Sequence, residues 1–119
     1  MQLTNEFLRD WLDGLRLVWL GKDIDALKSY FSEVDKYYED PFSVPVTSLV
    51  DILGLWEEVK SQDIDKLVFD ILAIEGATGI VHWHLVDQTG TFDGIYVIKF
   101  NQDLNCTEFR QWSCEKIKG

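Results

Sequence analysis

The chain has 119 residues, of which 46% are hydrophobic and 13% aromatic, and its formal net charge is −10. This length and apolar content predict one folded domain, residues 1–119, rather than a disordered segment. The acidic balance argues against nucleic-acid binding, which needs a basic face, and against anionic membranes. No apolar run approaches the ~20 residues of a membrane-spanning helix, and no secretory signal is recognisable, so a cytoplasmic protein is expected.

Two helices are predicted at the N-terminus. Thr4 or Asn5 is expected to cap the first, and Gly21 to end it in a left-handed conformation. Asp23 opens the second, shorter helix. The apolar residues of the first recur at the spacing of an amphipathic helix: Phe7, Leu8, Trp11, Leu12, Leu15, Val18 and Trp19. Those of the second are Ile24, Leu27 and Phe31.

The run Tyr37-Tyr38-Glu39-Asp40-Pro41-Phe42 follows these helices. Because a residue before proline is pushed out of the α region, Asp40 is expected at the end of an extended segment. Its carboxylate is either a solvated acid that caps a turn or a group that points into an apolar pocket. Only a carboxylate in an apolar pocket would indicate a catalytic role.

A third helix and four long strands complete the predicted elements. Ser48 is the expected N-cap of the helix, with Asp51 three positions on. Residues 67–74, 79–86, 92–100 and 106–114 are expected to be strands, because branched and aromatic residues alternate there between short turns. The apolar face of the helix carries Leu49, Ile52, Leu53, Trp56 and Val59. The segregated helices and strands predict an α+β fold, with the helices on one face of a strongly curved antiparallel sheet.

The cysteines and histidines do not predict a disulfide or a metal site. Cys106 and Cys114 lie on one predicted strand ~26 Å apart, whereas a disulfide needs Cα atoms within roughly 7 Å. His82 and His84 share one strand face, but zinc needs three or four ligands, so no metal is expected. Trp83 is expected to face the core and both histidines the convex side. The opposite register would place the histidines in a cavity as acid–base candidates, and the sequence does not decide between them.

The order of these elements resembles the nuclear transport factor 2-like superfamily. The likeness rests on Asp23–Leu27, on the run from Tyr38 to Phe42, and on the ending Val97–Phe100 and Thr107–Trp112. Within the superfamily the chain is most similar to ketosteroid isomerases and SnoaL-type polyketide cyclases. The resemblance implies a cone-shaped fold (a cystatin-like α+β barrel) around an apolar cavity. It also implies an apolar small-molecule ligand, no cofactor, and a homodimer formed through the convex face of the sheet.

The resemblance also implies candidate site residues. The family's catalytic base maps onto Asp40, and one of its two oxyanion donors onto Tyr96, whose alternative role is that of a core tyrosine. The other donor is a helix tyrosine, and Leu15-Arg16 occupies its position, so steroid isomerisation itself is disfavoured. Tyr38 shares strand parity with Asp40 and is expected to accompany it inward. The remaining expected cavity residues are Leu15, Trp56, Trp83, Phe109 and Gln111, although core packing would also explain the aromatic ones.

Two functions are therefore carried forward. The first is an isomerase, cyclase or dehydratase that acts on a hydrophobic carbonyl compound, with Asp40 as general base. The alternative is a non-catalytic ligand-binding or dimeric assembly module. Asp40 favours the enzymatic function, because burying an unpaired acid costs free energy and therefore indicates a functional role. The five tryptophans favour the non-catalytic module, because their bulky side chains would fill the cavity. No grouping of Ser, His and Asp or of Cys and His indicates a nucleophilic enzyme.

Overall fold

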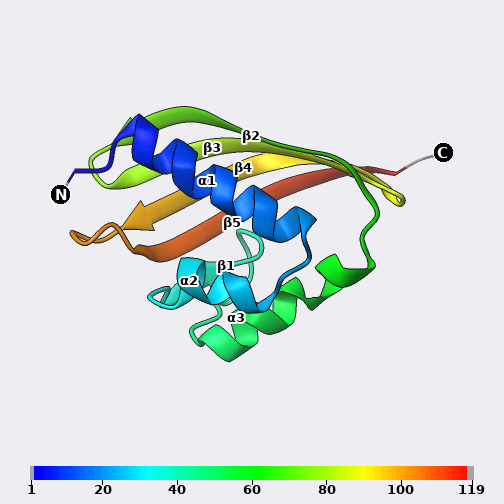
Figure 1. Ribbon diagram of the computed structural model, residues 1–119, viewed down its shortest axis with the longest axis horizontal. Helices are drawn as coiled ribbons and strands as arrows, with labels where there is room; N and C mark the ends of the chain where they lie inside the picture. The colour runs from blue at the N-terminus through cyan, green and yellow to red at the C-terminus, as the bar shows by residue number, and fades with distance from the viewer. Residues whose placement is uncertain (1, 118–119) are drawn as a thin grey trace.

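The computed structural model describes residues 2–117, and Figure 1 shows how the elements follow one another. The helices are α1 (Asn5–Leu20), η1 (Asp25–Leu27), α2 (Lys28–Phe31), α3 (Leu49–Leu55) and η2 (Trp56–Ser61), where η denotes a 3-10 helix. The strands are β1 (Lys36–Tyr38), β2 (Ile64–Glu75), β3 (Thr78–Asp87), β4 (Gly90–Phe100) and β5 (Cys106–Ile117). Three helical stretches (α1, η1–α2 and α3–η2), with the short strand β1 before the third, and then four long strands follow one another in the predicted order.

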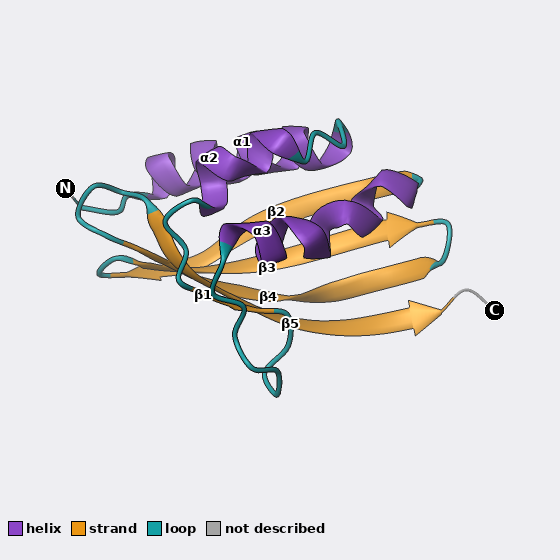
Figure 2. Ribbon diagram, turned by 90° about the horizontal axis from the view of Figure 1, so that it is seen from below, coloured by secondary structure: helices purple, strands orange, loops and turns teal. Residues whose placement is uncertain are grey.

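The strands form one sheet in the order β1-β5-β4-β3-β2. Strands β2 to β5 pair antiparallel as hairpins, whereas β1 pairs parallel to β5, with Lys36 opposite Glu108 and Tyr38 opposite Arg110. The sheet is therefore mixed and unclosed, which corrects the expectation of a purely antiparallel one. Figure 2 shows all the helices on one face of this bent sheet, and the predicted α+β cone is confirmed.

The helix boundaries follow their capping residues. The hydroxyl of Thr4 accepts a hydrogen bond from Phe7 N (3.1 Å), and that of Ser48 accepts one from Asp51 N (3.2 Å), as predicted. The expected left-handed Gly21 is wrong: Gly21 is right-handed, and the next residue, Lys22, has the positive φ of 57°. One face of α1 is buried against the sheet. Within residues 2–117 no helix is long and apolar enough to cross a membrane.

The core lies between the helices and the concave face of the sheet. Every second residue of β3 is buried, including Val81, Trp83 and Leu85, which is the period of a half-buried strand. A bulge between Ile71 and Ala73 shifts the register of β2. Because of this shift, Ile74 packs against the core instead of lying on the convex face of the sheet.

Both cysteines are reduced, as predicted. Cys106 is buried and Cys114 is exposed. Burial raises the pKa of the Cys106 thiol, which keeps this side chain neutral.

Candidate functional site

The main cavity has a volume of about 440 Å³ and is open to solvent on one side. It lies between the C-terminal end of α1, the helix η2 and the ends of β3, β4 and β5 beside the β3–β4 turn. In Figure 2 these helical segments and strand ends face one another across the wide end of the cone. The volume falls within the range of ligand pockets in proteins, ~300–1,000 Å³.

Aromatic side chains form the apolar wall of this cavity. Trp83 comes from β3, Phe92 from β4 and Trp19 from the last turn of α1. The Trp19 indole N–H donates to Gln62 Oε1 (2.9 Å), so this ring is held in place. The edge of the Trp83 indole lies over Gly94, where an added Cβ would be 2.8 Å from Trp83 Nε1 and would overlap the carbonyl oxygen of Trp112. Glycine at this position therefore makes room for Trp83.

Two buried indole N–H groups near the cavity have no partner. Within residues 2–117, Trp56 Nε1 and Trp83 Nε1 are buried without a hydrogen bond, although their residues are only 6% and 4% exposed. A buried donor left unpaired costs about 1–3 kcal/mol. Trp83 lines the main cavity with other atoms of its side chain, because its Nε1 is buried beside Gly94.

A smaller pocket of about 60 Å³ adjoins the main cavity and shares Trp19, Glu58 and Gln111 with it. Its other walls include Tyr37, Glu39 and Trp56. The Gln111 side-chain amide donates to the backbone carbonyl of Glu39 (3.2 Å), which fixes the end of β1 beside the cavity.

Acidic side chains surround both pockets. Glu58, Asp87 and Glu115 line the main cavity and Glu39 the smaller pocket, with no Lys, Arg or His among the described lining residues. The Asp87 carboxylate is engaged in the β3–β4 turn, where Oδ1 accepts hydrogen bonds from Thr89 N (2.8 Å) and Thr89 Oγ1 (2.6 Å). Partial burial, then Glu58 and then Asp40, raise the pKa of Glu39. The pKa of Glu39 is therefore shifted upward, which is the direction that favours a general base.

Asp40 lies outside both pockets. Phe42 N donates to Asp40 Oδ1 (2.8 Å) and Ser43 Oγ donates to Oδ2 (2.6 Å), so the carboxylate closes a turn around Pro41. These hydrogen bonds, that of Ser43 first, lower the pKa of Asp40. The structure does not place Asp40 in the main cavity or the smaller pocket, because the chain turns away from the sheet after β1; its role as a base stays a prediction.

The inward-facing tyrosine of β1 is Tyr37, not Tyr38. The Tyr37 ring stacks on Phe109 (centroids 5.3 Å apart, 7° between planes), and its burial raises the pKa of its hydroxyl. Tyr38 instead lies under the Arg110 guanidinium, 4.1 Å from ring centroid to Cζ, on the convex face. The expected register of this strand was wrong by one residue, because pairing of Tyr37 with both Phe109 and Val46 sets it.

Three other predicted site residues lie in the closed core. Leu15, Tyr96 and Phe109 are buried and do not line the two pockets, so Tyr96 is not brought together with Asp40. The Tyr96 ring contacts Phe109 (centroids 4.6 Å apart). Burial, and then Tyr37, raise the pKa of Tyr96 well above its usual value, so its hydroxyl is neutral.

The remaining expected residues do line a pocket: Trp83 the main cavity, Trp56 the smaller one, and Gln111 both. Their role in binding stays a prediction. Sequence reasoning anticipated Trp56 of η2 but missed Glu58 and Ser61 of the same helix and the other acids that line the pockets. One signal was present, since Glu115 continues the alternation of Gln111 and Ser113 along β5.

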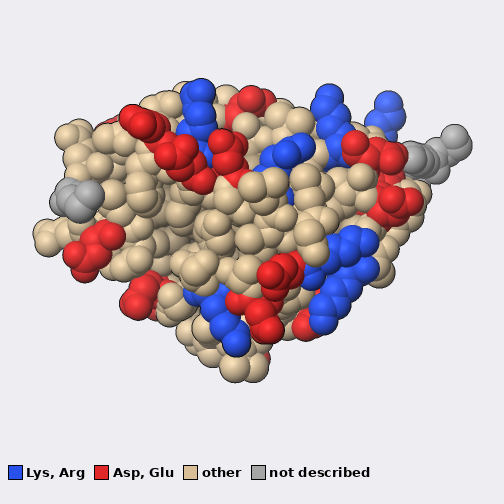
Figure 3. All heavy atoms as spheres, viewed as in Figure 1, with Lys and Arg blue, Asp and Glu red and all other residues tan. Residues whose placement is uncertain are grey.

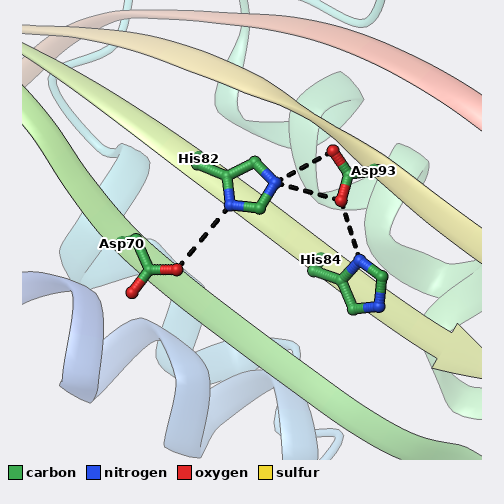
Figure 4. A network of polar contacts seen from close by, with 4 residues as sticks. All are labelled: Asp70, His82, His84 and Asp93. Atoms are coloured by element: carbon green, nitrogen blue, oxygen red, sulfur yellow. Dashed lines mark hydrogen bonds and ion pairs between the residues drawn. The ribbon is translucent and has the colours of Figure 1, made fainter.

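The two histidines lie on the convex face, as one of the two registers predicted. Figure 4 shows the Asp93 carboxylate between them, accepting from His82 Nε2 (2.9 and 3.0 Å) and His84 Nδ1 (2.8 Å), with Asp70 Oδ2 3.7 Å from His82 Nδ1. Hydrogen bonds from His84 and then His82 lower the pKa of Asp93. Within the described residues no group of three or more His, Cys, Asp or Glu side chains is arranged to hold a metal ion.

A second, shallower groove of about 540 Å³ lies on this convex face. Its walls are Asp40, Pro41 and Phe42 from the loop after β1, and Ile95, Trp112 and Cys114 among others from β4 and β5. Figure 2 shows that loop projecting from the sheet on the side opposite the helices. Phe42 is 96% exposed and Trp112 37% exposed, so the groove presents apolar surface to solvent.

Comparison with solved structures identifies the fold. A steroid delta-isomerase from Pseudomonas aeruginosa superposes with a TM-score of 0.69 at 13% identity, over 89% of this chain and 78% of that one. A putative SnoaL-like polyketide cyclase from Shewanella denitrificans superposes with a TM-score of 0.64 at 14% identity, over 89% of each chain. No protein-family model and no curated protein sequence matches the chain. The chain thus has the nuclear transport factor 2-like fold, as the resemblance in its sequence predicted.

Proposed function

We propose that this protein binds a small apolar carbonyl compound in the main cavity and acts on it as an isomerase, cyclase or dehydratase. The observation that carries the proposal is the open cavity of about 440 Å³ whose apolar wall is formed by Trp19, Trp83 and Phe92. The fold supports the same class, since two solved proteins that share it are described as an isomerase and a cyclase.

We propose Glu39 as the general base, with Asp40 as its rival. Glu39 lines the smaller pocket beside Tyr37 and Glu58, and its raised pKa brings it closer to the operating pH, where a general base is most effective. Asp40 is the acid that the family resemblance designates, but its oxygens are occupied by Ser43 and Phe42. The two carboxylates are adjacent in the chain, so conservative amide variants separate their roles.

The test is a ligand screen followed by proton exchange. Aromatic ketones, polyketide fragments and steroids would be screened by thermal shift, and bound ketones followed by NMR in D₂O for loss of the proton α to the carbonyl. Enzyme-dependent exchange that is lost in Glu39→Gln and retained in Asp40→Asn supports Glu39. The reverse pattern supports Asp40, and a bound ketone without exchange contradicts the enzymatic part of the proposal.

The second candidate function is a dimeric assembly or ligand-binding module without catalysis. The observation that favours it is the apolar groove beside Phe42 and Trp112 on the convex face, where partly buried Ile95 and Val97 extend the apolar surface. We propose that this face joins two copies of the chain into a homodimer. A cytoplasmic location, expected from the sequence, stays a prediction.

A further inference from the structure

The loop between β1 and α3 holds an aromatic side chain out in solvent. Phe42 is 96% exposed, more than any other large apolar side chain of the described residues. Two backbone hydrogen bonds between Tyr37 and Val46 (2.9 and 2.8 Å) close the base of the loop, and inside it the Asp40 carboxylate accepts from Phe42 N (2.8 Å). Figure 2 shows this loop projecting from the convex side of the sheet. The loop therefore presents Phe42 to solvent on a backbone that is held in place.

The groove of about 540 Å³ beside this loop lies on the same convex face. It is lined by Ile95 of β4 and by Trp112 and Cys114 of β5, and Phe42 forms one of its walls. In a dimer with two-fold symmetry one surface patch meets its own copy, so a projection and a recess on that patch can fill each other. A second copy of the chain thus brings to the groove a projecting aromatic ring.

The convex face does not share the acidic excess of the chain. Its paired rows carry five basic and four acidic side chains, whereas the whole chain has 11 basic and 21 acidic ones. These are Lys36, Lys66, Lys99, Arg110 and Lys116, and Asp70, Glu75, Asp93 and Glu108. Figure 3 shows acidic side chains, with basic ones among them, over the face that carries α1. Two copies with a net charge of −10 each can therefore meet through the convex face with little repulsion.

The charged groups beside the groove already have partners on the same chain. The Asp93 carboxylate lies between His82 and His84 and accepts a hydrogen bond from each (Figure 4). Arg110 Nε donates to the Glu108 carboxylate (2.8 Å). An apolar surface can cover these groups without leaving a charge unpaired, whereas a charged partner would compete with the existing pairs. An apolar occupant therefore fits this surface better than a charged one.

The sheet is large enough for a stable contact between two copies. Its four long strands have 10–12 residues each. A rise of ~3.3 Å per residue and a strand spacing of ~4.8 Å give a face of roughly 35 Å by 19 Å, or ~650 Å². Side-chain relief and the projecting loop add to this area, and a typical stable interface buries ~800 Å² of accessible surface per subunit. The convex face thus has the area that a dimer needs.

We infer that two copies dock convex face to convex face and insert their β1–α3 loops into each other's grooves, so that Phe42 of each copy packs against Trp112 of the other. Cys114 lies in the same groove and is covered by this contact. The inference rests on the proposed homodimer and specifies how its two copies bind each other. Each groove is completed only by the loop of the other copy.

The first test measures the dissociation constant of the dimer by sedimentation equilibrium at pH 7. Phe42→Ala is expected to raise this constant about 30-fold or more, which is the effect of removing an aromatic hot spot from an interface. The matched control is Val50→Ala, which should leave the constant unchanged. Val50 is also an exposed apolar side chain (80%), but it belongs to α3 on the helical side of the sheet.

The second test follows the reaction of Cys114 with Ellman's reagent, because this thiol lies in the groove itself. Cys106 is buried, so the rapid reaction of the folded chain belongs to Cys114 and should be absent in Cys114→Ala. The rate is expected to fall as the wild type passes from monomer to dimer with rising concentration, because the loop of the other copy covers the thiol. In Phe42→Ala the rate should stay at its monomer value over the same concentrations.

A wild-type dimer that Phe42→Ala leaves intact, or in which Cys114 reacts as fast as in the monomer, overturns the inference and leaves the homodimer in place. A wild type that is monomeric at all concentrations overturns the homodimer as well. Because Phe42 is exposed, Phe42→Ala is expected to keep the near-ultraviolet circular dichroism of the wild type, which separates a loss of the dimer from a loss of the fold.

Discussion

The indole ring of Trp83 is stacked on the phenol ring of Tyr96, with centroids 5.4 Å apart and 13° between the planes. One face of Trp83 is thereby held by the core, while the residue also lines the main cavity. Tyr96 in turn contacts Phe109 at a tilt, with 50° between the planes, so the wall of the cavity and the closed core form one aromatic unit.

Substitutions of the two stacked residues are expected to lower the free energy of unfolding by different amounts. Tyr96→Phe keeps the ring and its contacts with Trp83 and Phe109, and is therefore expected to change the free energy of unfolding by less than about 1 kcal/mol. Trp83→Ala opens the wall and the stack and is expected to cost about 3–5 kcal/mol. Urea denaturation measures both. A large loss in Tyr96→Phe would show that the hydroxyl has a structural partner.

Asp40→Asn tests whether the acid is a turn cap. The variant is expected to fold and to bind ketones like the wild type, with a modest loss of thermal stability, because Ser43 and Phe42 lose a charged acceptor. The lowered pKa of Asp40 contributes stability that is present above its usual value of 3.8 and lost as the pH falls through the folded pKa. The loss in the variant should therefore be clear at pH 7 and vanish in acid. Equal losses at both pH values would contradict this role.

For Glu39, beside Glu58, we expect the opposite pH dependence of stability. The raised pKa of Glu39 means that the folded chain binds its proton more tightly than the unfolded chain, so this group's contribution to stability falls as the pH rises through its titration. Glu58→Gln is expected to lower the pKa of Glu39, as followed by carboxyl-carbon NMR, and to leave the fold at pH 7 at least as stable. Glu57→Gln is the control, because this neighbouring acid pairs with Lys60. An unchanged Glu39 titration in Glu58→Gln would show that the two carboxylates do not interact.

The convex-face network predicts a measurable shift at Asp93. His84 makes the largest contribution to its lowered pKa, so His84→Ala is expected to raise the pKa of Asp93 towards its usual value. His84→Asn retains an N–H donor and should raise it less. A depressed carboxyl pKa stabilises the fold above the usual value, and this stability is lost as the pH falls through the folded pKa, so His84→Ala should matter at neutral pH and lose its effect in acid. NMR titration of the Asp93 carboxyl carbon decides the point.

The proposed homodimer predicts a change of mass in solution. Val97→Asp places a charge on the convex face and is expected to convert a dimer into a folded monomer, as measured by sedimentation equilibrium. Leu17→Asp is the matched control, because Leu17 is 67% exposed on α1, on the helical side of the sheet. A wild-type chain that is monomeric at all concentrations would overturn the proposal.

Local patterns were enough to predict most of the fold. The hydroxyls of Thr4 and Ser48 mark the helix starts, and the period-two alternation around Trp83 places that residue inward. These signals are reliable because capping and side-chain alternation depend on only a few adjacent residues.

Long-range packing accounts for what the patterns missed. Strand β1 has three residues, too few for an alternation to show which tyrosine faces inward, so its pairing with β5 selects Tyr37. The walls of the two pockets bring Glu39, Glu58 and Glu115 together from three distant segments, and no spacing in the chain encodes that proximity. The position of Asp40 could not be predicted either. Its motif identifies an acid before a proline, but the path of the backbone after β1 directs the carboxylate away from the main cavity.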